Sequence, residues 1–252
     1  MRVPTPQTTG EPGQPRWTHL FLDTPRAAFE EAVTFWSTVT GWTPSERRGE
    51  SGQFLTLLPG EGPAWVRMQA VEGAAGVHLD LDSTDRTAAV ARAAALGATH
   101  AWTYEDVEVV RSPGGLLVCH TVLDGATCLV RGGDALLDQV CIDVPRARWE
   151  AETAFWSAVT GTGLDVLDAT YARLDQQGRP RILLQRLDEA DGPVRAHPDL
   201  AVRDREATTL LHTRSGAEVL AVQPWWTVLR APGGQVYCLT DREPGTGRPP
   251  ED

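Results

Sequence analysis

An internal repeat is the feature that most constrains the fold of this 252-residue chain. The segment HLFLDTPRAAFEEAVTFWSTVTG at 19–41 aligns without gaps on QVCIDVPRARWEAETAFWSAVTG at 139–161. GVHLDLDSTDR at 76–86 matches RAHPDLAVRDR at 195–205, and VVRSPGGLLVC at 109–119 matches TVLRAPGGQVYC at 227–238. The offset between the copies is almost constant across the three blocks. A register held that long indicates two tandem copies of one module.

The repeat also predicts the domain organisation. We expect a first domain over residues 16–124 and a second over 135–241, joined by a linker at 125–134. Residues 1–15 and 242–252 are rich in Pro, Gly, Thr and charge. Such segments bury little apolar surface, so we expect two disordered tails.

Within each half, hydrophobic periodicity predicts strands and helices in a fixed order. Strands are expected at 19–23, 53–58, 64–71, 76–82, near 106–111 and at 116–122. A helix should start at Thr24 and Pro25 and end at Gly41, and a second should run from Asp85 to Leu96. The second half repeats this with helices near 145–160 and 204–215. Each half then contains two βαβββ units, and the fold class is α+β.

This pattern, together with the SPGG or APGG turn before the last strand, resembles the vicinal-oxygen-chelate superfamily, which includes glyoxalases, bleomycin-resistance proteins and dioxygenases. The HLD sequence at 78–80 and the Cys in the final strand are similar to its glyoxalase-like domains. The resemblance implies two domains, each with an open, cup-shaped sheet. It also implies up to four metal ligands per cup, from the first and last strands of each unit.

Composition limits the partners. The formal net charge is −11, which disfavours nucleic acid and anionic membranes. No run of about 20 apolar residues suggests a membrane span, and the N-terminus lacks the apolar core of a signal peptide. We therefore expect a cytoplasmic monomer or homodimer with a small-molecule partner. The chain has no Lys, which excludes Schiff-base chemistry on a lysine.

Strand alternation predicts which side chains face each cup. In the first cup, the positions implied as ligands by the resemblance hold His19, Gln69, His78 and Cys119. In the second they hold Gln139, Gln185, His197 and Cys238. The superfamily's usual set is His or Gln, Glu, His and Glu, so both cups lack both carboxylates.

The candidate chemistry of the first cup rests on His19, His78 and Cys119. These could act in catalysis or hold zinc, because imidazole and thiolate are both zinc ligands. The favoured interpretation is that no metal binds, since buried Cys is more often a small hydrophobe. Asp80 could orient an imidazole or solvate the cup. The second repeat has Gln139 at the position of His19. Because a His can titrate and a Gln cannot, we expect any ligand or metal to favour the first cup.

Further candidates could line the cups. Trp102 and Trp226 could contact a flat ligand, or they could pack under the sheets. Arg111 could bind an anionic group or pair with one of the many carboxylates.

The sequence therefore predicts a small-molecule-binding protein, with the first cup the more active. It leaves open whether the protein is an enzyme. Three interpretations remain: a lyase or isomerase acting on a small oxygenated metabolite, a drug-sequestering protein of the bleomycin-resistance type, or an interaction scaffold in which both cups are vestigial.

Overall fold

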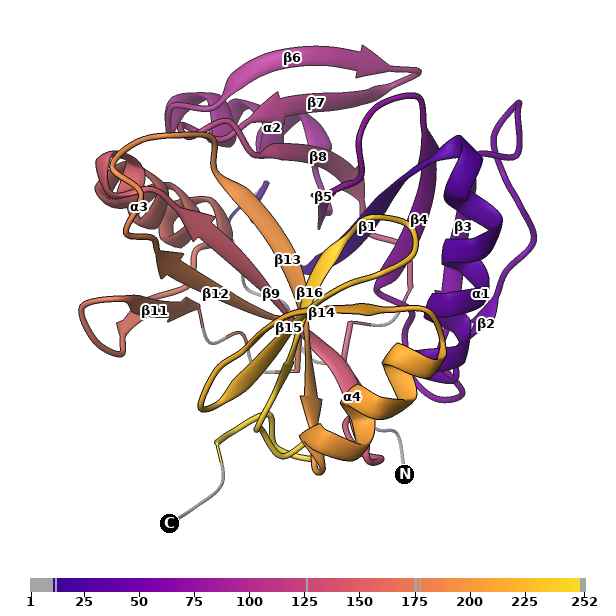
Figure 1. Cartoon of the computed structure of the whole chain (residues 1–252). Helices are drawn as coiled ribbons and strands as arrows, with labels where there is room; N and C mark the ends of the chain where they lie inside the picture. The colour runs from indigo at the N-terminus through magenta and orange to yellow at the C-terminus, as the bar shows by residue number, and fades with distance from the viewer. Residues whose placement is uncertain (1–10, 12, 126, 175, 177, 250–252) are drawn as a thin grey trace, which may run out of the picture.

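The computed structural model describes residues 11, 13–125, 127–174, 176 and 178–249, and they form two eight-stranded sheets with the same strand order (Figure 1). The first sheet runs β2-β3-β4-β1-β5-β8-β7-β6 and the second β10-β11-β12-β9-β13-β16-β15-β14. Each sheet joins two βαβββ units at its centre, through antiparallel β1–β5 and β9–β13 pairs. The predicted α+β class and the tandem arrangement are confirmed, and neither sheet closes into a barrel.

The first half contains these elements in chain order: β1 (Trp17–Pro25), α1 (Phe29–Thr40), β2 (Thr43–Pro44), β3 (Phe54–Leu58), β4 (Val66–Val71), β5 (Gly76–Ser83), α2 (Arg86–Ala95), β6 (Thr99–Tyr104), β7 (Val107–Arg111) and β8 (Leu117–Val122). The second half contains β9 (Ala135–Val144), α3 (Trp149–Thr160), β10 (Leu164–Val166), β11 (Tyr171–Leu174), β12 (Arg181–Arg186), β13 (Arg195–Val202), α4 (Arg205–Arg214), β14 (Glu218–Val222), β15 (Trp226–Arg230) and β16 (Val236–Thr240).

Helix starts differ between the two units of each half. The expected start of the first helix at Thr24 and Pro25 is wrong, because β1 continues through Pro25 and a short 3-10 turn at Arg26–Ala28 precedes α1. The second helix starts where expected, since Asp85 caps α2 by accepting a hydrogen bond from the Ala88 amide. Gly41 ends α1 in the left-handed conformation. The start of a helix is therefore easier to predict where a side chain caps it, as Asp85 does, than where the preceding strand continues through a proline.

The two halves share one hydrophobic core and interlock through their PGG turns. In one direction, the buried Glu152 on α3 accepts hydrogen bonds from the Gly114 amide and from Trp156 Nε1. In the other direction, Gln235 donates to the Asp23 carbonyl and to Thr24 Oγ1. The PGG motif therefore joins the two halves rather than forming part of a cup.

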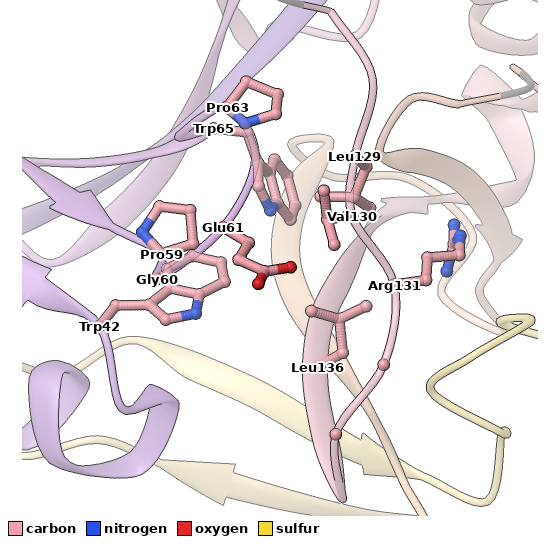
Figure 2. A pocket seen from close by; sticks show the side chains of 12 residues that line it. Trp42, Pro59, Gly60, Glu61, Pro63, Trp65, Leu129, Val130, Arg131 and Leu136 are labelled. Carbon is pink, nitrogen blue, oxygen red and sulfur yellow. The ribbon is translucent and has the colours of Figure 1, made fainter.

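The predicted linker is packed between the two halves. Leu129 belongs to the common core, and its amide donates a hydrogen bond to the Gly178 carbonyl of the second half. Trp65 of the first half joins the same core, and its Nε1 donates to the Leu137 carbonyl on β9. A cavity of about 250 Å³ lies at this junction, with the Glu61 side chain and the linker residue Val130 on its walls (Figure 2).

The expected tails lie partly outside the described residues, but parts of both are packed. Gln14 donates a hydrogen bond to the Thr160 carbonyl, and Arg242 binds the fully buried Asp138 carboxylate at 2.7 Å. The prediction of disorder for 1–15 and 242–252 therefore does not fit residues 13–15 and 242–249. No helix in the described part of the chain is long and apolar enough to cross a membrane.

Two buried histidines make stability depend on pH. Burial lowers the pKa of both His120 and His212 to about 4, and neither ring nitrogen of His120 has a hydrogen-bond partner among the described residues. Each is neutral in the folded state but binds a proton near pH 6.5 when unfolded. The stability that each contributes is complete above pH 6.5 and is lost as pH falls toward 4.

We expect His120→Leu to reduce acid sensitivity, because it removes one of these titrating groups. At pH 5 the wild-type histidine should cost about 2 kcal/mol relative to pH 8. Urea unfolding at both pH values measures this, with the exposed His100→Leu as the control. An equal loss of stability in wild type and His120→Leu would contradict the assignment.

Candidate ligand-binding cups

The first cup is a cavity of about 420 Å³ on the face of the first sheet that alternation assigned to it. Its lining includes the predicted residues Gln69, His78, Asp80, Trp102 and Cys119. The intervening residues of the same strands, such as Leu79, are fully buried on the opposite face. Most polar residues of this cup therefore come from the four consecutive central strands of the sheet, β4, β1, β5 and β8.

His78, Asp80 and Cys119 form the polar floor of this cup. Their candidate ligand atoms all lie within 4.8 Å of one another, because Asp80 on β5 pairs with Cys119 on β8. His78 Nδ1 lies 2.7 Å from Asp23 Oδ2, and its Nε2 lies 3.7 Å from Asp80 Oδ1. Asp23 therefore fixes the ring so that Nε2 faces the other two side chains.

Burial and neighbouring charges set the protonation of the floor. Burial disfavours the imidazolium, but Asp23 and Cys119 outweigh it and raise the pKa of His78 well above its usual value. Burial raises the pKa of Asp80, against the opposing effects of His78 and Arg67. Burial also raises the pKa of the Cys119 thiol. Burial thus opposes ionisation of the thiol, while Asp23 favours the charged form of the imidazole.

Two arginines enter the first cup: strand alternation predicts Arg67 on the cup face, whereas Arg48 was not predicted from the sequence. Arg48 and Arg67 both line it, and burial together with the Arg67 charge lowers the pKa of Arg48. Arg48 donates to the hydroxyls of Ser45 and Thr56, and Arg67 reaches Asp80 Oδ2 only at 3.5 Å. The two guanidinium groups bring two positive charges into this cup of an acidic protein.

Aromatic rings form the walls above these charges. Phe21 stacks on the His78 ring with centroids 4.5 Å apart, and Phe54 lies edge-on to Phe21 at 6.4 Å and to Tyr104 at 5.9 Å. Trp102, on the edge strand β6, completes this wall and is 45% exposed. The combination of aromatic walls and a few polar groups is typical of small-molecule sites.

His19 is placed differently from the other predicted site residues. It lies on the cup face, but it lines a neighbouring cavity of about 380 Å³ with Trp17 and Arg67. Its Nδ1 is 3.1 Å from Asp82 Oδ2, and Asp82 also accepts a hydrogen bond from the Thr121 hydroxyl. The structure therefore brings His78 and Cys119 together but does not place His19 with them.

The two histidines of the first half are held in a reciprocal way. Each βαβββ unit begins with a His-x-x-x-Asp sequence, His19 to Asp23 and His78 to Asp82. Because β1 and β5 are antiparallel, each histidine contacts the aspartate of the other unit. In the second half the first of these motifs begins with Gln139, so only the contact between His197 and Asp143 persists.

Arg111 lies outside the cup. Its guanidinium packs 5.9 Å from the Trp102 ring centroid and reaches the Gly115 carbonyl at 3.4 Å. Its contact with Trp102 is its link to the wall of the cup.

The second cup, of about 500 Å³, repeats the floor of the first. His197 Nε2 is 3.2 Å from Asp199 Oδ1 and 3.5 Å from Cys238 Sγ, and its Nδ1 is 3.1 Å from Asp143 Oδ2. The pairing of Asp199 with Cys238 matches that of Asp80 with Cys119. The predicted Gln139, Gln185 and Trp226 also line this cup.

Two substitutions change the chemistry of the second floor. Leu183 occupies the position of Arg67. The strand-pairing registers show this, since Arg67 pairs with the residue two positions before Asp23, and Leu183 pairs with the residue two positions before Asp143. That residue is Phe21 in the first cup and Cys141 in the second. The Sγ of Cys141 and the candidate ligand atoms of His197 and Asp143 lie within 4.8 Å of one another. Cys141 lies midway between Gln139 and Asp143, so the alternation of side chains along β9 would have placed it on the cup face from the sequence alone.

The fold and the two cups define a class of protein: tandem vicinal-oxygen-chelate domains, each with an open cup and a polar floor. The glyoxalase-like domain family matches the chain twice, over residues 19–121 and 139–240. The chain belongs to this family, as the resemblance predicted.

Solved structures with the same fold include several dioxygenases. A 2,2',3-trihydroxybiphenyl 1,2-dioxygenase from Sphingomonas wittichii is 15% identical, with a TM-score of 0.60 and 90% of each chain covered. A homoprotocatechuate 2,3-dioxygenase mutant from Brevibacterium fuscum is 15% identical with a TM-score of 0.62, covering 98% of this chain and 77% of that one. At such identities the likeness shows the fold alone. No curated protein matches the sequence significantly.

The metal ligands implied by the superfamily do not fit this chain. His19 is bound to Asp82 beside another cavity, Gln69 is a neutral amide, and burial raises the pKa of the Cys119 thiol. A divalent ion at those positions would have His78 as its one strong ligand.

Proposed function

We propose that this protein binds small anionic aromatic compounds, such as aryl carboxylates, in its first cup. The observation that carries the proposal is the pair of guanidinium groups, Arg48 and Arg67, below the aromatic walls of a 420 Å³ cavity. Neither arginine has a carboxylate closer than the 3.5 Å contact of Arg67 with Asp80 among the described residues. Members of the superfamily bind small-molecule substrates, which is consistent with such a site.

Electrostatics explain why the ligand should carry a negative charge. Two like charges in a partly buried site repel each other, and an anion between them removes that repulsion while forming charge-assisted hydrogen bonds. The net charge of −11 would otherwise repel an anion. The local arginine pair must therefore supply the attraction, and the rings of Phe21, Phe54 and Trp102 would contact the ligand's apolar part.

Calorimetric titration with phenylacetate and with phenylacetamide tests the proposal. The two ligands have almost the same shape, but only the first is charged. We expect the carboxylate to bind at least tenfold more tightly, because a hydrogen bond to a charged group contributes about 1.5–3 kcal/mol.

Variants then locate the site. Arg48→Gln should weaken phenylacetate binding by about tenfold to a hundredfold and leave phenylacetamide binding unchanged. Arg111→Gln is the matched control, because that arginine lies outside the cup. Equal affinity for both ligands, or an Arg48→Gln variant that binds like wild type, would contradict the proposal.

A lyase or isomerase is the second candidate, and Asp80 is the observation that favours it. Burial raises its pKa, and its Oδ1 is buried in the floor of the cup with no hydrogen-bond partner among the described residues. Such a carboxylate could remove a proton from a bound ligand. Incubation of bound phenylacetate in D₂O would show this as exchange of the protons next to the carboxylate, lost in Asp80→Asn. Binding without exchange would instead favour a sequestering role.

A further inference from the structure

We propose that the cavity between the first half and the linker binds a small organic cation of the quaternary ammonium type. This cavity of about 250 Å³ is separate from both cups, and the described residues that line it line neither of them (Figure 2). Its walls come from the loop between β3 and β4, the linker, the start of β9, and Trp42 after α1. A ligand here would contact the first half and the segment that joins it to the second.

Most of the cavity wall is apolar and includes two indole rings. Trp65 is fully buried, Trp42 is partly buried, and Leu129 and Leu136 are buried beside them. The face of an indole ring attracts a cation through the ring quadrupole. A quaternary ammonium has no N–H to donate, so it does not need the hydrogen-bond acceptors that a primary ammonium requires.

Glu61 supplies a negative charge to this apolar cavity. Figure 2 shows its carboxylate pointing from the loop into the space between the two indole rings and the linker. Within the described part of the chain, this carboxylate takes part in no hydrogen bond or ion pair. It is therefore available to pair with the charge of a ligand.

Arg131 is the cationic residue among those that line the cavity, and it is engaged elsewhere. Its Nη1 lies 2.5 Å from Oδ2 of Asp138, a carboxylate that is fully buried. In Figure 2 the Arg131 guanidinium points away from Glu61. The net charge of −11 adds a long-range attraction for a cation. A cationic ligand would therefore meet Glu61 without competition from this arginine.

The loop that carries Glu61 is conformationally restricted. Pro59 and Pro63 flank it, and Gly62 has a φ of +80°, which favours glycine. A Cβ at residue 62 would lie only 2.6 Å from Val130 Cγ2, so the loop approaches the linker closely. The cavity is thus formed before a ligand arrives, which lowers the entropic cost of binding.

Calorimetric titration with choline and with 3,3-dimethylbutan-1-ol tests the site. The two compounds have the same shape, but only choline is charged. We expect the neutral alcohol to bind about tenfold more weakly than choline, because the indole face and the carboxylate both attract the charge. In ¹H–¹⁵N spectra, choline should shift the indole signal of Trp42, which Trp42→Phe identifies by its loss.

Variants separate the two sources of attraction. Glu61→Gln should weaken choline binding by about fivefold and leave binding of the alcohol unchanged. Trp42→Leu should weaken choline binding by about tenfold, because leucine keeps an apolar wall but has no aromatic face, whereas Trp42→Phe should retain most of the binding. Glu31→Gln is the matched control, since it removes one exposed negative charge on α1, away from the cavity.

Three results would each overturn the site: no choline binding, equal binding of the two compounds, or a Glu61→Gln variant that binds choline like wild type. Circular dichroism checks the fold of Trp42→Leu, and Glu61→Gln alone decides if that variant unfolds. The proposal does not depend on anion binding in the first cup. Glu61→Gln should bind phenylacetate normally and Arg48→Gln should bind choline normally, so the two proposals can fail independently.

Discussion

Purified protein is expected to convert the methylglyoxal–glutathione hemithioacetal at least a hundredfold more slowly than a glyoxalase with both glutamates, whichever metal is supplied. That reaction moves a proton between adjacent carbons and needs a base next to the metal. The positions of the two glutamates hold Gln69 and Cys119, or Gln185 and Cys238. An amide cannot take the proton, and burial raises the pKa of both thiols, which keeps them neutral.

Loss of a general base alone typically costs about a hundredfold to ten-thousandfold in rate. The assay uses protein loaded separately with nickel, zinc and cobalt, each with His78→Ala and His197→Ala variants as controls. Turnover at ordinary enzyme rates with any of these metals, abolished by either variant, would show that a base has been overlooked. Asp80 and Asp199 would be the first residues to test.

Replacing Glu152 with alanine should lower the free energy of unfolding by about 3 kcal/mol, since a buried donor left unpaired costs about 1–3 kcal/mol. The Glu152 carboxylate accepts one hydrogen bond from Gly114 of the other half and one from Trp156. Both donors would be left without that partner. Denaturant unfolding measures the loss, and the exposed Glu150→Ala on the same helix is the control.

Glu152→Gln should have an intermediate effect. Its side-chain oxygen can still accept from the Gly114 amide, but its NH₂ group would face the indole N–H of Trp156, and two donors cannot bond. A Glu152→Ala variant as stable as Glu150→Ala would show that the contact between the halves contributes little.

Much of the fold could be predicted from the sequence because its signals are local and repeated. The duplicated blocks give two equal halves, and alternation in β4 and β5 places Gln69, His78 and Asp80 on the cup face. Alternation identifies the face of a strand but not the position along it. His19 lies on the predicted face, yet Asp82 of the neighbouring strand holds it beside another cavity.

The residues that sequence analysis missed have other causes. Arg48 lies outside the named strands, in a segment joined to Phe54 by an isolated bridge, so no periodicity marks it as a cup residue. The role of the PGG turn was also hidden, because its partner Glu152 is 38 residues away in the other half. Contacts between the halves depend on how the two sheets pack, which a repeat does not specify.

The central claim is that the first cup binds a small anionic aromatic compound beside its two arginines. A crystal grown with phenylacetate tests it most directly. The account predicts ligand density in the first cup, with the carboxylate beside Arg48 and Arg67 and the ring against the aromatic wall. Ligand density in the second cup alone would contradict it.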